Sequence, residues 1–136
     1  MKCVWAFVYI ASFVIVSVQA DWLSDVIHYS ELCETQFPTA KENIEKMFKG
    51  ELKAINADDT LTCFVKCIME KQGTFVRGTF SMPGLMKITE LDKSLKEIQA
   101  PILQKGEACR YEKGENDCET AFKIALCMSE KIADIA

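Results

Sequence analysis

Cysteine is the residue type in this sequence with the most evident chemistry. The stretch CFVKCIMEKQG begins at Cys63 and places Cys67 four positions further on, one turn apart if the segment is helical. Such a pair can bind a metal, act in redox chemistry, or contribute to a disulfide framework. A structural zinc site needs a second pair of ligands, and the single histidine, His28, does not supply one. We therefore expect no metal site and no cofactor.

The other reactive residues do not form a catalytic pattern. No nucleophile motif surrounds a serine, and His28 has no His–Asp pair in the calcium-dependent setting of a small secreted phospholipase. Asp25 lies three residues before His28, which predicts a surface contact on a helix, with at most a minor pH-sensing role. We expect no catalytic residue and no enzymatic activity. The formal net charge of −4, without a basic cluster, also argues against nucleic acid or an anionic membrane as partner.

The first twenty residues have the pattern of a secretory signal peptide. Lys2 precedes an apolar run that ends in VSVQA, where Val18 and Ala20 suit signal peptidase. A membrane anchor is the alternative, but the apolar run is short for a span of roughly 20 residues. We predict a signal peptide over residues 1–20 and one mature domain over residues 21–136, secreted and without stable membrane insertion.

Loss of the signal peptide leaves an even number of cysteines, because Cys3 is removed with it. An even set in a small secreted chain predicts a disulfide framework, since free thiols do not persist in an oxidising compartment. The cysteines of the mature chain are Cys33, Cys63, Cys67, Cys109, Cys118 and Cys127.

The elements that must position these cysteines read as helices nearly throughout. Apolar residues recur on one helical face between Trp22 and Cys33. The acidic pair at residues 58–59 suits the N-terminus of a helix that ends near Gly73. Two segments resemble capping boxes, and each is expected to begin a helix: Thr39 with Glu42, and Asn116 with Glu119.

Two segments are less regular. Residues 73–84, GTFVRGTFSMPG, contain three glycines and a proline, which argues against a helix, yet they are apolar enough to fold onto the core or cover a site. Further on, the apolar residues from Ile88 to Ile102 keep helical phase across Pro101. A proline inside a helix kinks or ends it. Because the phase continues, we expect a kink.

Helical geometry limits which cysteines can pair. Cys118 and Cys127 are expected on one helix, roughly 13 Å apart at about 1.5 Å per residue, too far for a disulfide. Cys63 and Cys67 lie on one face with nearly parallel Cβ directions, which is poor disulfide geometry. Excluding both pairs leaves about ten of the 15 connectivities that six cysteines allow.

The cysteine spacing resembles that of the six-cysteine insect odorant-binding proteins, in the pheromone-binding and general odorant-binding superfamily. The intervals from Cys33 are 29, 3, 41, 8 and 8 residues. That family keeps three residues between its second and third cysteines and eight between its fifth and sixth. The resemblance covers the whole mature chain and implies the pairing Cys33–Cys67, Cys63–Cys118 and Cys109–Cys127.

The resemblance also implies an all-α fold, with about six helices around a buried apolar pocket. The implied function is a secreted carrier that takes small hydrophobic ligands (odorants, pheromones or fatty-acid-like molecules) through sensillar lymph to an olfactory receptor. A monomer or weak homodimer is expected. Tyr29, Tyr111 or Thr74 is expected to fix the ligand's polar group, and Phe75 or Phe80 to form a lid. Helical phase places these residues at the pocket: Val26, Val65, Ile68, Met69, Phe75, Phe80, Ile88, Leu91, Leu95, Phe122, Ile124 and Met128.

The chain departs from some family members in its short C-terminal tail. Only MSEKIADIA follows Cys127, too short to refill a long pocket as the long tails do at low pH. We expect Ile132 and Ile135 to form pocket wall instead. Two alternatives to an olfactory carrier remain open: the same fold in saliva, haemolymph or reproductive fluid, and a disulfide-stapled defence or structural protein without a cavity.

Overall fold

The computed structural model describes residues 24–49, 51 and 57–133. The predicted signal peptide therefore lies outside the described residues, as does Ile135. The side chain of Ile132 is also outside the described part. Within the described part, no helix combines the length and the apolar character needed to cross a membrane.

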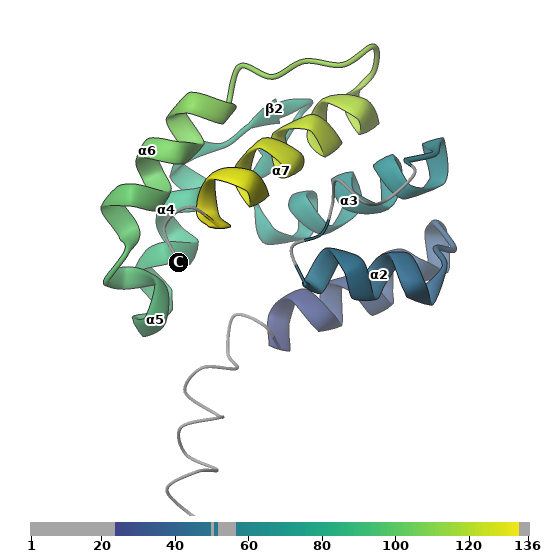
Figure 1. The fold of residues 1–136 in the computed structure, drawn as a ribbon, viewed down its shortest axis with the longest axis horizontal. Coiled ribbons are helices and arrows are strands. Elements are labelled where there is room, and N and C mark those ends of the chain that lie inside the picture. Colours follow the sequence, from purple (N-terminus) through teal and green to yellow (C-terminus); the bar gives the residue numbers. More distant parts are fainter. Residues whose placement is uncertain (1–23, 50, 52–56, 134–136) are drawn as a thin grey trace, which may run out of the picture.

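The described chain is helical apart from one small hairpin (Figure 1). An N-terminal helix is described over residues 24–36. The elements that follow are α2 (Lys41–Phe48), α3 (Asp59–Gln72), β1 (Phe75–Val76), β2 (Thr79–Phe80), α4 (Met82–Leu91), α5 (Lys93–Lys96), α6 (Gln99–Cys109) and α7 (Asp117–Ala133). The predicted all-α fold is confirmed.

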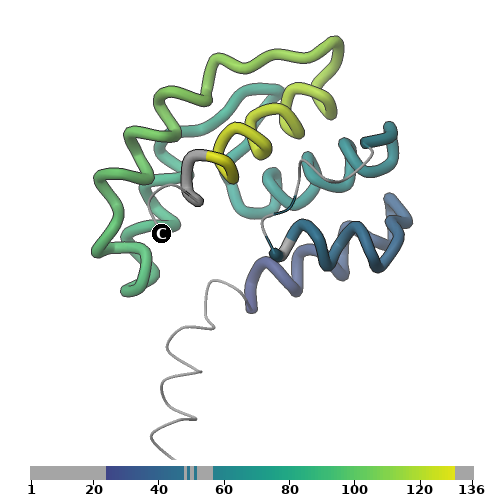
Figure 2. Tube along the Cα trace, viewed as in Figure 1, coloured from purple at the N-terminus to yellow at the C-terminus, as the bar shows by residue number. Residues whose placement is uncertain are grey.

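Helices α3 and α7 lie side by side at the centre of the bundle (Figures 1 and 2). The N-terminal helix and α2 lie on the far side of α3. Helices α4, α5 and α6 form a second group, which packs on α7 through α6. The hairpin packs on the central pair, since β1 contacts α3 and β2 contacts α7, and the chain passes from it into α4.

Local capping sets the bounds of α3, as the sequence predicts. The Asp58 carboxylate accepts a hydrogen bond from the Leu61 backbone N–H at 2.8 Å, which satisfies one of the free donors of the first turn. Gly73 ends the helix in the left-handed conformation, with φ of 80°.

Of the two predicted capping boxes, one is formed in part and one is wrong. Asn116 accepts a hydrogen bond from the Glu119 backbone N–H at 2.9 Å, and α7 begins directly after it. The Glu119 carboxylate accepts from the Glu115 backbone N–H at 2.9 Å, one residue before the position that a capping box requires. At α2 the residue before the helix is Ala40, and no side chain caps it. The Thr39 hydroxyl instead donates to the Phe37 carbonyl at 2.9 Å, so a local turn competes with the cap.

The expected kink at Pro101 is also wrong, because the chain forms three helices rather than one bent helix. Asp92 is extended, and its carboxylate accepts a hydrogen bond from the Ser94 backbone N–H at 2.8 Å, so it separates α4 from α5. Pro101 is the third residue of α6. Proline is tolerated there because the first-turn N–H groups have no partner within the helix.

The glycine-rich segment folds onto the core as a hairpin. Phe75 pairs with Phe80 across it, and Arg77 and Gly78 at the turn both have positive φ, which two-residue hairpin turns require. The segment is not irregular to its end, since α4 begins at Met82. Phe75 is 1% exposed, so it is a core residue and not a lid.

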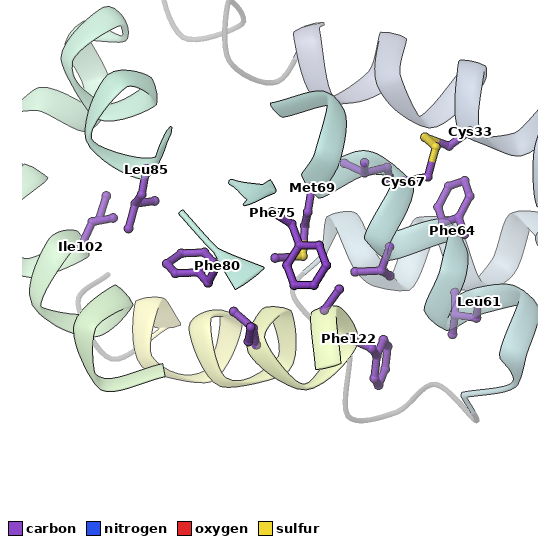
Figure 3. Packing of buried hydrophobic residues seen from close by; sticks show 14 residues of the cluster. Cys33, Leu61, Phe64, Cys67, Met69, Phe75, Phe80, Leu85, Ile102 and Phe122 are labelled. Carbon is purple, nitrogen blue, oxygen red and sulfur yellow. A yellow bond between two sulfur atoms is a disulfide. The ribbon is translucent and has the colours of Figure 1, made fainter. Parts of the chain in front are cut away.

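The core follows the contact between α3 and α7 (Figure 3). Its largest side chains with almost no exposed surface include Leu61, Phe64, Phe75 and Ile124. Figure 3 shows Leu85 and Ile102 of the second helical group set apart from this centre, across from Phe80 and Met69. All four residues belong to one hydrophobic cluster, which therefore extends from the centre of the bundle to α4 and α6.

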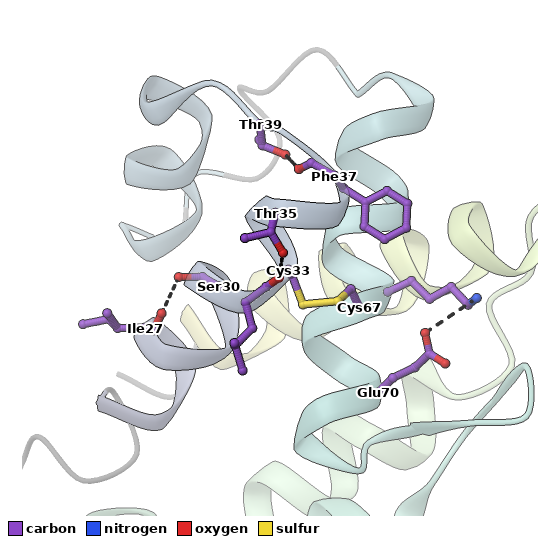
Figure 4. Close-up of a disulfide and its surroundings, with 10 residues drawn as sticks. Ile27, Ser30, Cys33, Thr35, Phe37, Thr39, Cys67 and Glu70 are labelled. Carbon is purple, nitrogen blue, oxygen red and sulfur yellow. Dashed lines mark hydrogen bonds and ion pairs between the residues drawn. A yellow bond between two sulfur atoms is a disulfide. The ribbon is translucent and has the colours of Figure 1, made fainter.

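Three disulfides connect the helices in the pairing that the resemblance implies. Cys33–Cys67 joins the N-terminal helix to α3, as Figure 4 shows. Cys63–Cys118 joins α3 to α7, and Cys109–Cys127 joins α6 to α7. The two cysteines of CFVKCIMEKQG thus belong to separate bridges. All six are engaged as disulfides, so none of these sulfurs is available as a thiolate ligand for a metal.

Candidate functional site

An apolar cavity of about 270 Å³ lies between the group of α4, α5 and α6 and the rest of the bundle. Helices α4, α5 and α6 form one side of it, and the C-terminal parts of α3 and α7 form the other, together with β2. Its lining residues are Met69, Gln72, Thr74, Phe80, Leu85, Ile88, Thr89, Leu95, Ile102, Ala125, Met128 and Ser129.

Each element turns its lining residues inward by its own periodicity. Ala125, Met128 and Ser129 are spaced i, i+3 and i+4 on α7 and so share one helical face. In β2, Thr79 is exposed and Phe80 is buried, because successive side chains of a strand point to opposite faces. The cavity wall is therefore built from segments that are distant in the sequence.

Three hydroxyl groups of the lining have their protons engaged by the backbone. The Thr74 hydroxyl donates to the Met69 carbonyl at 3.2 Å, and the Ser129 hydroxyl donates to the Leu126 carbonyl at 2.9 Å. The Thr89 hydroxyl, buried at 1% exposure, donates to the backbone carbonyls of its own helix. These groups retain acceptor lone pairs but no free proton.

Thr89 also holds two helices together. Its hydroxyl oxygen accepts a hydrogen bond from the Gln99 side-chain amide at 3.0 Å, which joins α4 to the beginning of α6. The polar wall on this side of the cavity is thereby fixed in place. Among the described residues, no Lys, Arg, His, Asp or Glu lines the cavity, so the described part of its wall carries no formal charge.

The structure brings five of the predicted pocket residues together at this cavity. They come from α3, β2, α4, α5 and α7 respectively, namely Met69, Phe80, Ile88, Leu95 and Met128. Their contact with a ligand stays a prediction.

The other predicted pocket residues do not line the cavity. Six are buried in the hydrophobic interior instead: Val26, Val65, Ile68, Phe75, Phe122 and Ile124. Residues of this set on α3 and α7 are buried because these helices pack against one another. Leu91 is 76% exposed, since α4 ends there and Asp92 changes the direction of the chain. Helical phase alone had assigned it to the inner face.

Sequence reasoning missed most of the small and polar lining residues. Gln72 lies three residues after Met69 on α3, and Ser129 directly follows Met128 on α7. This closeness to predicted pocket residues was the available signal. Of the three expected polar groups, Thr74 lines the cavity. Tyr111 is 72% exposed, and Tyr29 packs against the core instead.

A helical bundle stapled by three interlocked disulfides around an apolar cavity is the architecture of a protein that can enclose a small hydrophobic molecule. The comparison with protein families agrees. The model of the PBP/GOBP family matches residues 17–131, so the chain belongs to this family.

Individual relatives are consistent with this assignment. The chain is 24% identical over 115 residues to general odorant-binding protein 57c of Drosophila melanogaster, covering 82% of this chain and 70% of that protein. It is 29% identical over 108 residues to general odorant-binding protein 56a of the same species, covering 71% and 75% respectively.

Solved structures share the fold. The odorant-binding protein OBP28a of Drosophila melanogaster superposes with a TM-score of 0.69 at 14% identity, covering 85% of this chain and 96% of that one. The fatty acid binding protein OBP56a from the oral disk of the blowfly Phormia regina gives 0.62 at 21% identity, covering 82% and 91%.

Proposed function

We propose that this protein is secreted after removal of residues 1–20 and carries a small hydrophobic odorant through sensillar lymph to an olfactory receptor. The observation that carries the proposal is the apolar cavity of about 270 Å³ in a member of the PBP/GOBP family. Its volume is close to the lower end of ligand pockets, roughly 300 Å³, which suits a ligand smaller than a drug molecule.

Affinity in this proposal comes from burial of the apolar ligand surface, at about 25 cal/mol per Å². Two methionines of the wall, Met69 and Met128, provide flexible, polarisable contacts that adapt to ligand shape. The disulfides stabilise the bundle, so the helices around the cavity do not need a filled interior to stay in place.

One comparison favours a second candidate, a carrier in a fluid outside the olfactory organ. The Phormia regina protein of the same fold is named for fatty acid binding and comes from the oral disk. Localisation of the transcript and protein to antennal sensilla or to mouthparts and salivary tissue would separate the two candidates.

The first experiment expresses the full chain in a eukaryotic secretory host and purifies the product from the medium. Mass spectrometry should show an N-terminus at Asp21 and no free thiol. Titration with a fluorescent apolar probe should give saturable, one-to-one, micromolar binding that is lost when the disulfides are reduced. Absence of binding by a folded, fully oxidised sample would refute the carrier function and favour the structural alternative.

A pair of variants locates the site. Ala125→Trp places a large side chain in the cavity and should abolish probe binding. Ala108→Trp adds the same group on the exposed surface of α6 and should leave binding unchanged. Circular dichroism checks that both variants fold. Amide chemical-shift mapping on the unmodified protein gives an independent localisation, which would contradict the proposal if the probe shifted residues away from the cavity.

A further inference from the structure

We propose that the cavity selects an uncharged ligand that carries a hydroxyl or carbonyl oxygen, and that Gln72 is the group that binds this oxygen. The inference rests on the proposed carrier function, because it names the ligand chemistry of the same cavity. The evidence for it is which donors and acceptors of the polar side chains in the wall already have a hydrogen-bond partner.

The first step concerns charge. None of the described lining residues ionises, so a carboxylate that entered the cavity would lose hydration without gaining a cationic partner among them. Removing an unpaired ion from water costs far more than burying a neutral polar group. The wall therefore disfavours fatty acids in their ionised form relative to alcohols, aldehydes or esters of the same chain length.

The second step concerns hydrogen-bond donors. The hydroxyl protons of Thr74, Thr89 and Ser129 already bind backbone carbonyls, so these side chains can only accept a hydrogen bond from a ligand. A ligand carbonyl oxygen needs a donor, and these three groups do not provide one, whereas a ligand hydroxyl can also donate to their lone pairs.

Gln72 provides that donor. It is the last residue of α3, immediately before the left-handed Gly73 that ends the helix, and its side chain is half-buried at the cavity. Within the described part of the chain, no hydrogen bond engages its amide. A primary amide offers two N–H donors and one carbonyl acceptor. It can therefore donate to a carbonyl oxygen, or exchange hydrogen bonds with a hydroxyl group.

The test measures displacement of the fluorescent probe by decanol, decanal, decane and decanoate at neutral pH. Decanol and decanal should bind at least about tenfold more tightly than decanoate, because only the carboxylate must be buried as an ion. Gln72→Leu should weaken decanol and decanal by about threefold to tenfold, the usual worth of one hydrogen bond, and should leave decane unchanged within about twofold.

Gln104→Leu is the matched control. It makes the same substitution at an exposed position of α6 that does not line the cavity, so all affinities should stay within about twofold. Gln72→Met serves as a second variant if Gln72→Leu does not fold.

Two results would refute the proposed ligand selectivity, and one would refute the carrier function on which it rests. Decanoate binding as tightly as decanol would contradict the charge argument, because the described wall offers no cation to a carboxylate. Equal weakening of decane and decanol in Gln72→Leu would mean that Gln72 only shapes the wall. Failure of all four ligands, decane included, would instead refute the carrier function.

Discussion

Removal of the Cys63–Cys118 disulfide offers a direct test of how the bundle is stabilised. The bridge joins α3 to α7 and closes a loop with a sequence separation of 55 residues. In the chain-entropy relation, a loop of this length restricts the unfolded state by about 14 cal/mol/K, or about 4 kcal/mol at 25 °C. Native domains of this kind have only about 5–15 kcal/mol in total. Cys63→Ala with Cys118→Ala should therefore remove a large share of the stability.

This bridge is the cleanest choice because its sulfurs contribute little to packing. Both cysteines are half-buried, whereas Cys33 and Cys109 have no exposed surface. Replacing a fully buried cysteine would add a packing loss to the entropic effect. Neither Cys63 nor Cys118 lines the apolar cavity, so ligand affinity of the folded variant should stay within about twofold of the parent.

The assay is urea unfolding of the secreted variant, followed by circular dichroism. The free energy of unfolding should fall by about 4 kcal/mol, and the m-value should rise because the unfolded chain exposes more surface. The comparison variant removes Cys109–Cys127, whose separation of 18 residues gives about 3 kcal/mol from the same relation. Because the buried Cys109 adds a packing loss to this value, the comparison uses the m-value, which should rise less than for Cys63–Cys118. A loss below about 1 kcal/mol, with the remaining bridges paired as in the parent, would refute the reasoning.

Three further predictions concern local structure. Gly84→Ala should destabilise the protein by about 1–3 kcal/mol in thermal unfolding, because its Cβ would lie 1.9 Å from the Gly73 carbonyl oxygen; an unchanged melting temperature would contradict this packing. Asp58→Ala should cost about 1 kcal/mol in urea unfolding through loss of the α3 cap, and Asp58→Asn should restore most of it. The backbone N–H of Glu115 lowers the pKa of Glu119 from its ordinary 4.5. The ionised Glu119 carboxylate therefore stabilises the fold above pH 4.5, and this effect disappears as the pH falls through the lower folded-state pKa. Glu119→Gln should reduce this pH dependence of the free energy of unfolding.

Much of the fold could be predicted from local signals in the sequence. The Asp58 cap, the Gly73 stop and the Asn116 cap depend on residues within one helical turn, and the structure has all three. The same kind of signal was wrong at Thr39, whose hydroxyl turns back to the Phe37 carbonyl. Local patterns indicate which hydrogen bonds are available, but the path of the chain decides between competing bonds.

Helical phase likewise predicted burial better than it predicted the site. It placed Ile68 and Met69 of α3 on buried faces, and both are buried. It could not distinguish them, although Ile68 lies in the packed interior and Met69 faces the cavity. The break at Asp92, which exposes Leu91, was also missed because the apolar period continues through it.

The sequence by itself determined the class of the protein. The number and spacing of its cysteines, with a helical period around them, were enough to indicate a disulfide-stapled bundle, because these features are properties of the linear chain. Only the tertiary structure decided the site. The cavity is the space left between α4, α5 and α6 on one side and α3, β2 and α7 on the other. Its wall depends on how segments distant in the sequence pack, and no periodicity within one helix encodes that arrangement.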